Sequence, residues 1–140
     1  SAENLIEYKN SDEALSISSS LLILEDKSGN SNLNDILLKD FSPTTQTVLN
    51  LGISESVFWI KIHIKNASSS NNLILDLSLP TLDIVEFYYP EGNNYTSILM
   101  GEKLPFHQRK YKDPNYLFDL FIPKGSTKIY FLKIKFLLKD

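Results

Sequence analysis

The sequence has no cysteine in its 140 residues. This absence excludes a disulfide framework, a thiol nucleophile, and zinc or iron–sulfur sites bound by thiolates. Histidine is scarce too: His63 and His107 lie 44 positions apart and form neither a His-x-x-x-His nor a His-Glu-x-x-His pair. A Gly-rich phosphate loop and a Gly-x-Ser-x-Gly elbow are also missing. We therefore expect a protein that is not an enzyme and that needs no cofactor or metal.

Carboxylates are the remaining candidates for catalysis, because two of them could meet in space to hydrolyse a glycoside. Those on predicted strands are Asp76, Asp83, Glu86 and Asp119. We interpret them as ordinary carboxylates on strand surfaces.

The sequence also lacks an apolar run of the roughly 18 residues needed to span a bilayer. It opens on Ser1-Ala2-Glu3-Asn4, without the basic start and apolar stretch of a signal peptide. We expect Ser1-Ala2 to be a tag remnant on an excised fragment. Residues 1–14 then form a polar leading segment, poorly ordered at first, and residues 15–140 form a single domain.

The charge is modest and uneven, with a net value of -3. Residues 1–60 carry -6 and residues 61–140 carry +3. An acidic balance argues against a broad nucleic-acid surface. A local basic cluster comprises Lys103, His107, Arg109, Lys110 and Lys112. Such a run, taken alone, is typical of a solvated loop.

The most informative segment that is present runs from Phe58 to Asn66. It alternates strictly, which is the pattern of a β-strand with one buried face. Phe58, Ile60, Ile62 and Ile64 form one face, and Trp59, Lys61, His63 and Lys65 form the other. The only tryptophan thus falls on the polar face. It either belongs to a binding surface or covers a second, smaller core.

The rest of the sequence reads mainly as short strands separated by turns. Apolar alternation or β-rich composition predicts strands within residues 15–26, 73–79, 82–89, 95–100, 115–122 and 128–138. Residues 42–56 read as a Ser/Thr-rich connection. One short helix is expected near residues 33–39, with Asn32 as its cap and Asp35 in its first turn. This order predicts an all-β fold, an antiparallel jelly-roll sandwich.

Three separated segments, taken together, resemble one known family. They are Leu51-Gly52-Ile53 with Phe58-Trp59-Ile60-Lys61 and Ile64-Lys65-Asn66; Leu82-Asp83-Ile84-Val85-Glu86-Phe87-Tyr88; and Gly101-Glu102-Lys103-Leu104-Pro105-Phe106 with Arg109, Asn115, Phe118 and Leu120. Their order and spacing resemble the type-2 extracellular domain of bacterial seven-transmembrane receptors with diverse intracellular signalling modules. The likeness covers roughly residues 15–137. The sequence departs from the family pattern at Lys61, where arginine is common, and at Asp113-Pro114.

The resemblance implies a jelly-roll sandwich similar to carbohydrate-binding modules. It also implies a periplasmic or extracellular location, as part of an inner-membrane receptor to which downstream helices tether the domain. A histidine kinase, a diguanylate cyclase or a related output module would follow inside the cell. The implied role is the sensing of a carbohydrate or related small molecule, and pairing of the domain with itself stays open.

A sugar offers apolar C–H faces for stacking on an aromatic ring and hydroxyls for hydrogen bonding. The candidate ligand-binding residues are Trp59, Lys61, His63, Arg109, Tyr111 and Asn115. Arg109 suits a carboxylate or vicinal hydroxyls because its guanidinium presents a fixed fork of donors. The alternative for Arg109 is a structural ion pair with Asp83 or Glu86.

Two rival functions remain open from the sequence. One is a structural or protein-interaction domain of the receptor, without a small ligand. Leu117 and Phe121 favour this rival, since they share a strand face with Asp119 and are apolar for a solvated surface. The other is a carbohydrate-binding accessory module of a secreted glycosidase.

Overall fold

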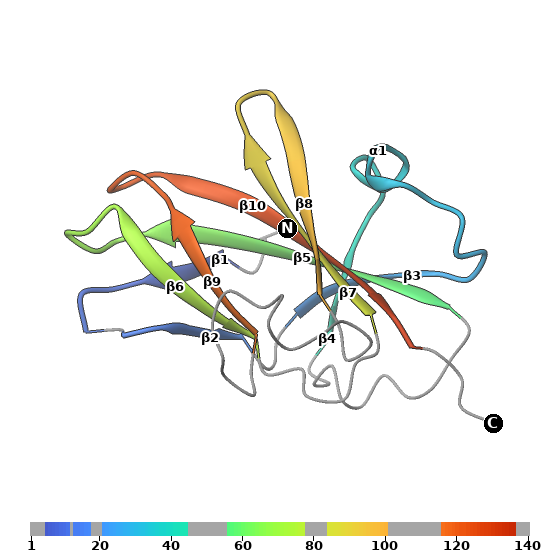
Figure 1. The fold of residues 1–140 in the computed structure, drawn as a ribbon, viewed down its shortest axis with the longest axis horizontal. Coiled ribbons are helices and arrows are strands. Elements are labelled where there is room, and N and C mark those ends of the chain that lie inside the picture. Colours follow the sequence, from blue (N-terminus) through green and yellow to red (C-terminus); the bar gives the residue numbers. More distant parts are fainter. Residues whose placement is uncertain are drawn as a thin grey trace.

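A computed structural model describes residues 5–11, 13–17, 21–44, 56–77, 84–100 and 116–136. Three of the predicted ligand-binding residues, Arg109, Tyr111 and Asn115, lie outside these ranges, as does the predicted basic cluster. The described chain is an all-β sandwich with one short helix (Figure 1), which confirms the predicted fold class.

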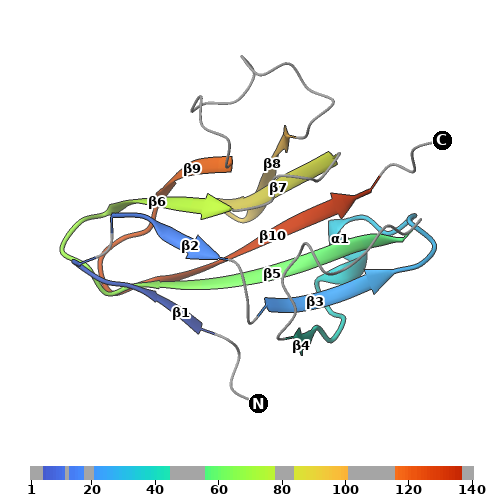
Figure 2. The ribbon, with the colours of Figure 1, turned by 90° about the horizontal axis from the view of Figure 1, so that it is seen from below.

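Two sheets make up the described part of the sandwich. The large sheet contains, in spatial order, β4 (Ser42–Thr44), β3 (Leu21–Asp26), β5 (Val57–Asn66), β10 (Thr127–Lys135), β7 (Ile84–Glu91) and β8 (Asn94–Met100), with β1 (Leu5–Tyr8) also paired to β5. The small sheet contains β2 (Leu15–Ile17), β6 (Asn72–Leu77) and β9 (Tyr116–Phe121). The small sheet covers one end of the large sheet, and the helix lies toward the other end (Figures 1 and 2).

The main core lies between the two sheets. Strand β5 supplies the predicted apolar face, and Ile60, Ile62 and Ile64 are all at most 1% exposed. The facing side chains of the small sheet include Leu75 and Leu77, which are equally buried. Because successive strand residues point to opposite faces, this burial fixes the register of β5.

A second, smaller core lies on the outer face of the large sheet. Its fully packed members are Ile36, Val57, Trp59 and Phe131. The helix α1 (Leu33–Ile36) supplies Ile36 to this cluster and so covers one end of the outer face. Trp59 is therefore part of a core, which is the alternative that the sequence left open.

Local sequence explains why α1 begins where it does. The Asn32 side chain accepts a 3.0 Å hydrogen bond from the Asp35 backbone N–H, and the Asp35 carboxylate accepts one of 2.8 Å from the Asn32 N–H. This reciprocal pair satisfies two N–H groups that a helix start leaves unpaired. The predicted cap is confirmed, although the α-helix is shorter than the expected 33–39 range.

Two short strands differ from the sequence-based expectation. Strand β1 lies in the segment expected to be poorly ordered, and it pairs in parallel with residues 63–66 of β5. Tyr8 at its end is 7% exposed and belongs to the main core, so burial of one ring anchors the segment. Strand β4 lies in the predicted connection and pairs with β3. Both strands are too short to show a clear alternation.

Candidate functional site

A cleft of about 660 Å³ opens at the side of the sandwich where the small sheet ends. Its described lining comes from β7 and the following turn, β8, β9 and β10. These residues are Phe87, Tyr89, Pro90, Glu91, Gly92, Ile98, Leu117, Phe118, Asp119, Leu120, Phe121, Lys128 and Tyr130. The volume falls within the roughly 300–1,000 Å³ that is usual for small-molecule sites.

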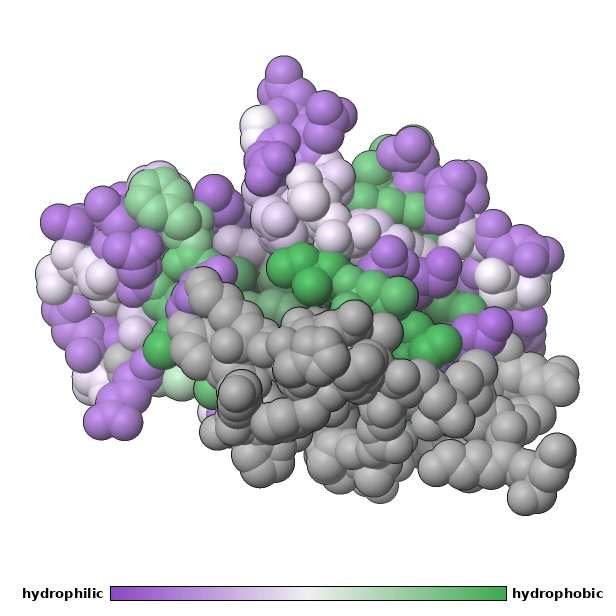
Figure 3. All heavy atoms as spheres, in the orientation of Figure 1, coloured by the Kyte–Doolittle hydropathy of each residue, from purple (hydrophilic) through white to green (hydrophobic). Residues whose placement is uncertain are grey.

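The cleft exists because the two sheets differ in width. In the described residues, β9 is an edge of the small sheet, whereas the large sheet continues past β10 to β7 and β8. The inner faces of β7 and β8 are thus only partly covered by a facing strand. The tip of the β7–β8 hairpin is hydrophilic, and apolar side chains gather toward its base (Figure 3).

Stacked aromatic rings form one wall of the cleft. Phe87 lies at its centre, with ring centroids 4.3 Å from Phe118 at an interplanar angle of 24° and 5.6 Å from Tyr130 at 11°. The Tyr89 ring lies next to that of Phe87 on the same strand, with centroids 6.2 Å apart and an interplanar angle of 25°. Rings from three strands therefore run nearly parallel, and a partly exposed Tyr89 offers a flat apolar surface.

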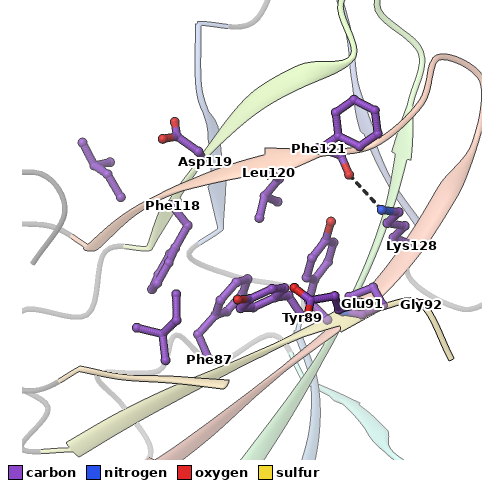
Figure 4. Close-up of a pocket in the computed structure, with 13 residues that line it drawn as sticks. Phe87, Tyr89, Glu91, Gly92, Phe118, Asp119, Leu120, Phe121 and Lys128 are labelled. Carbon is purple, nitrogen blue, oxygen red and sulfur yellow. Dashed lines mark hydrogen bonds between the residues drawn. The ribbon is translucent and has the colours of Figure 1, made fainter. Parts of the chain in front are cut away.

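Polar groups border the aromatic wall. Lys128 donates a 2.9 Å hydrogen bond from Nζ to the Phe121 carbonyl oxygen, and its ammonium lies 5.6 Å from the centroid of the Phe121 ring. Glu91 is an exposed carboxylate on β7 at the rim of the cleft, whereas the Asp119 side chain on β9 points away from the aromatic rings (Figure 4). The cleft thus combines a hydrophobic platform with a cation and the carboxylate of Glu91.

The phenol of Tyr130 adds a neutral polar group to the lining. Burial, with a further contribution from Tyr95, raises the pKa of Tyr130 above its ordinary value of 10.0. The hydroxyl is protonated at neutral pH, as in an ordinary tyrosine, and it can both donate and accept a hydrogen bond.

A second hollow of about 320 Å³ lies beside the cleft. Its described lining is His63, Pro90, Gly92, Tyr95, Thr127, Lys128 and Ile129. The side chain of His63 is half-buried and lies on the outer face of β5. One predicted ligand-binding residue therefore lines a concave surface.

Trp59 offers no surface to a ligand in this structure, since it is 0% exposed. Its ring lies 5.5 Å from that of Tyr88, and the Lys133 ammonium lies 5.4 Å from its centroid. The indole Nε1 is buried without a hydrogen-bond partner in the described structure. These contacts make Trp59 a packing residue whose ring also forms a cation–π interaction with Lys133.

Lys61 lies between Trp59 and His63 on the outer face, half-buried and paired across the sheet with Phe131 and Leu22. It lines neither hollow among the residues named for them. The grouping of all six predicted residues into one site stays a prediction, because Arg109, Tyr111 and Asn115 fall outside the described residues.

Sequence reasoning missed most of the cleft residues. The sequence pattern places Phe87 and Tyr89 on one face of β7, and it places Phe118 and Leu120 on one face of β9. What the sequence did not show is that β7 and β9, from different sheets, face each other. The apolar pair Leu117 and Phe121, singled out as unusual for a solvated face, was the signal closest to the site.

In the described part of the chain, no group of three or more His, Cys, Asp or Glu side chains could hold a metal ion. None of the helices in the same part is long and apolar enough to span a membrane.

Comparison with known proteins places the domain in a family. The family model 7TMR-DISM extracellular 2 matches residues 18–136, which is most of the chain. No curated protein matches the sequence. The match agrees with the resemblance seen in the sequence, and this type of domain lies on the outer side of the membrane in seven-transmembrane receptors. The chain therefore belongs to the 7TMR-DISM extracellular 2 family.

Proposed function

We propose that this extracellular receptor domain senses a carbohydrate or related small molecule by binding it in the cleft between β7, β8, β9 and β10. The observation that carries the proposal is the stacked wall of Phe87, Tyr89 and Phe118 beside charged groups. Sites of this composition fix an apolar face by contact and fix its orientation by a few polar groups.

The chemistry of the wall suits a sugar ring. The C–H face of the ring stacks on Tyr89, which is the partly exposed member of the aromatic wall. Glu91 accepts hydrogen bonds from hydroxyl groups, whereas Lys128 donates them. The proposal rests on these cleft residues and not on Trp59, whose indole is buried.

The predicted residues outside the described ranges fit the same proposal by their place in the chain. Asn115 directly precedes Tyr116, the first residue of β9, and β9 forms one wall of the cleft. Arg109 and Tyr111 lie a few residues earlier. We propose that this segment contributes the remaining polar contacts to the ligand.

Binding acts as a signal only if it favours one arrangement of the receptor over another. A ligand shifts such an equilibrium by no more than its differential affinity for the two states. Because the cleft is built from both sheets, a ligand that touches β7 and β9 favours the sheet spacing that fits it.

The test is binding of a glycan panel measured by isothermal titration calorimetry. Tyr89→Ala should weaken binding of any glycan found by about fivefold or more, since one stacking contact contributes about 1 kcal/mol. Leu99→Ala is the matched control, because Leu99 is 52% exposed and does not line the cleft. Unchanged affinity in Tyr89→Ala, or a panel without a single binder, would contradict the proposal.

The proposed module is not a catalyst. Incubation with simple aryl glycosides should therefore release no aglycone above the buffer blank. Release that disappears in Asp119→Asn or Glu91→Gln would overturn this part of the proposal.

A second candidate is a protein-interaction domain, which could include pairing of two copies. Phe121 at 57% and Leu99 at 52% exposed favour it, because large apolar side chains on a surface often mark interfaces. Sedimentation of the isolated domain across a concentration series distinguishes the candidates. A dimer that Phe121→Ser dissociates would favour the interaction function, whereas a monomer throughout would leave the ligand proposal as the better one.

A further inference from the structure

The cleft and the second hollow share three lining residues, Pro90, Gly92 and Lys128. The two hollows lie on opposite faces of the large sheet. Tyr130 of the cleft points to the main core, whereas His63 and Ile129 of the second hollow lie on the outer face, where Ile129 packs against the second core. Because the same three residues line both hollows, there must be an opening between the strands of the sheet at this point.

The strand pairing shows where this opening lies. Strands β10 and β7 are paired only from Phe131 opposite Tyr88 to Lys135 opposite Ile84. Strand β7 continues to Glu91 in its pairing with β8, and β10 begins at Thr127 in its pairing with β5. Both strands thus extend past their last contact with each other. The tip of the β7–β8 hairpin stands away from the beginning of β10 (Figure 1).

A proline explains the separation. Continuing the register would place Pro90 opposite Ile129, and proline has no N–H to donate across the ladder. The Ile129 carbonyl instead accepts a 2.9 Å hydrogen bond from the Tyr95 hydroxyl. The opening is therefore held by a specific contact and is part of the fold.

The two hollows differ in charge. The cleft contains the carboxylate of Glu91, whereas the described lining of the second hollow contains no carboxylate. The second hollow has His63 and, at the junction, Lys128. In the described structure the Lys128 ammonium has no carboxylate partner, and only one of its three N–H groups is used, by the Phe121 carbonyl.

We propose that the two hollows form one continuous site for an elongated acidic glycan of two or more linked sugar rings. This inference rests on the proposed function and specifies its ligand class. One ring stacks on Tyr89, the partly exposed member of the aromatic wall, and a carboxylate of a uronic acid unit binds at the junction, next to Lys128 and facing His63. The reasons are the shared lining, the combined size of the hollows, and a cation placed where they meet.

The experiment uses a panel of uronic acid oligosaccharides of one to four rings, each as the free acid and as the methyl ester. The ester keeps the ring and its hydroxyls but removes the charge. We expect a free acid of two or more rings to bind at least about tenfold more tightly than its ester and than the single-ring acid. Equal affinities for acid and ester, or for one ring and several, would overturn the inference.

Lys128→Met tests the junction directly, because methionine keeps the length of the side chain and removes the charge. It should lower the affinity for the acid about tenfold and lower the affinity for the ester much less, since the ester loses only the hydrogen bonds that Lys128 donates to hydroxyl groups. Lys124→Met is the matched control, since Lys124 is exposed in the β9–β10 turn and lines neither hollow. A loss of acid binding as large in Lys124→Met would show a general charge effect and contradict the assigned site.

Failure of this inference is distinguishable from failure of the proposed function. Neutral glycans that bind in a manner sensitive to Tyr89→Ala, without preference for acids, would reject the acidic ligand and keep the sensing cleft. A panel in which neither acids nor esters nor neutral glycans bind would reject both.

Discussion

The hydroxyl of Tyr95 donates a 2.9 Å hydrogen bond to the main-chain carbonyl of Ile129. The bond joins the β7–β8 hairpin to β10 at the level where the β10–β7 pairing has already ended. The ring of Tyr95 also packs edge-on against Phe131, with centroids 5.7 Å apart. A side chain thus replaces the backbone ladder and fixes the hairpin that borders both hollows.

Tyr95→Phe should destabilise the domain by about 1 kcal/mol, because it removes one hydrogen bond to a partly buried carbonyl and keeps the ring packing. Urea unfolding followed by circular dichroism measures the loss. Tyr89→Phe is the control, since no hydrogen bond of its hydroxyl is seen in the described structure, and it should change stability by less than about 0.5 kcal/mol. Equal losses in the two variants would contradict the role given to Tyr95.

Asn66 links three segments at one end of the sandwich. Its amide Nδ2 donates to the carbonyl oxygens of Ser70 at 2.6 Å and Ile122 at 2.7 Å, and its Oδ1 accepts from the Ser68 N–H at 2.9 Å. Asn66 and Ile122 are both 0% exposed, so the bond between the Asn66 amide and the Ile122 carbonyl oxygen is shielded from water. Asn66→Ala should therefore cost about 2–4 kcal/mol, because it removes several hydrogen bonds and leaves the buried Ile122 carbonyl oxygen without its Asn66 donor.

The same urea titration checks this prediction against Asn72→Ala. Asn72 is exposed and no hydrogen bond of its side chain is seen in the described structure, so its loss should stay within about 0.5 kcal/mol. A small effect in Asn66→Ala would show that the link is dispensable.

Trp59→Ala should destabilise the domain by about 3–5 kcal/mol, as is usual for removal of a large buried aromatic side chain. The cause is the cavity left beneath Tyr88, Lys133 and α1. Lys135→Ala, at an exposed position of the adjacent strand, provides the comparison. A Trp59→Ala variant that melts like the unaltered domain but loses glycan binding would show that Trp59 belongs to the binding site and not to the core.

Asp26 should make stability depend on pH in the acidic range. Burial raises the pKa of this carboxyl, but hydrogen bonds outweigh burial and leave the pKa below its ordinary value of 3.8. The donors include the Ser28 hydroxyl at 2.7 Å and the Ser31 N–H at 3.0 Å. Because the folded-state pKa is the lower one, the ionised carboxylate stabilises the fold above about pH 4, and this stabilisation is lost as the pH falls through the folded-state pKa.

Asp26→Asn should accordingly destabilise the domain at about pH 6 and have a smaller effect at about pH 2.5. Urea unfolding at both pH values gives the comparison. An equal loss at the two pH values would mean that packing, and not the charge, explains the effect.

The sequence predicted the elements whose signals are local. The alternation from Phe58 to Ile64 identified the central strand and its buried face, and Asn32 identified the start of α1. Strand β1 was missed because four residues that pair in parallel with a distant strand leave no local pattern. Tyr8, its one buried ring, gives no signal until the partner strand is placed.

The cleft could not be predicted from the sequence for a related reason. Alternation shows that Phe87 and Phe118 each lie on a buried face, but not that their rings stack 4.3 Å apart across two sheets. The same pattern placed Trp59 among polar neighbours, although α1 and its flanking segment cover it. Tertiary contacts between distant segments decided both outcomes.

The burial of Asn66 has a practical consequence for production of the domain. Asn66-Ala67-Ser68 and Asn94-Tyr95-Thr96 both match the acceptor pattern for N-linked glycosylation. In the folded domain the amide of Asn66 is occupied by two carbonyl oxygens, while Asn94 is exposed at the hairpin. A eukaryotic host that glycosylates Asn66 during synthesis would attach a bulky group to a side chain that the fold encloses. Secretion from such cells should therefore improve when Ser68 is replaced by alanine, which removes the acceptor pattern at Asn66.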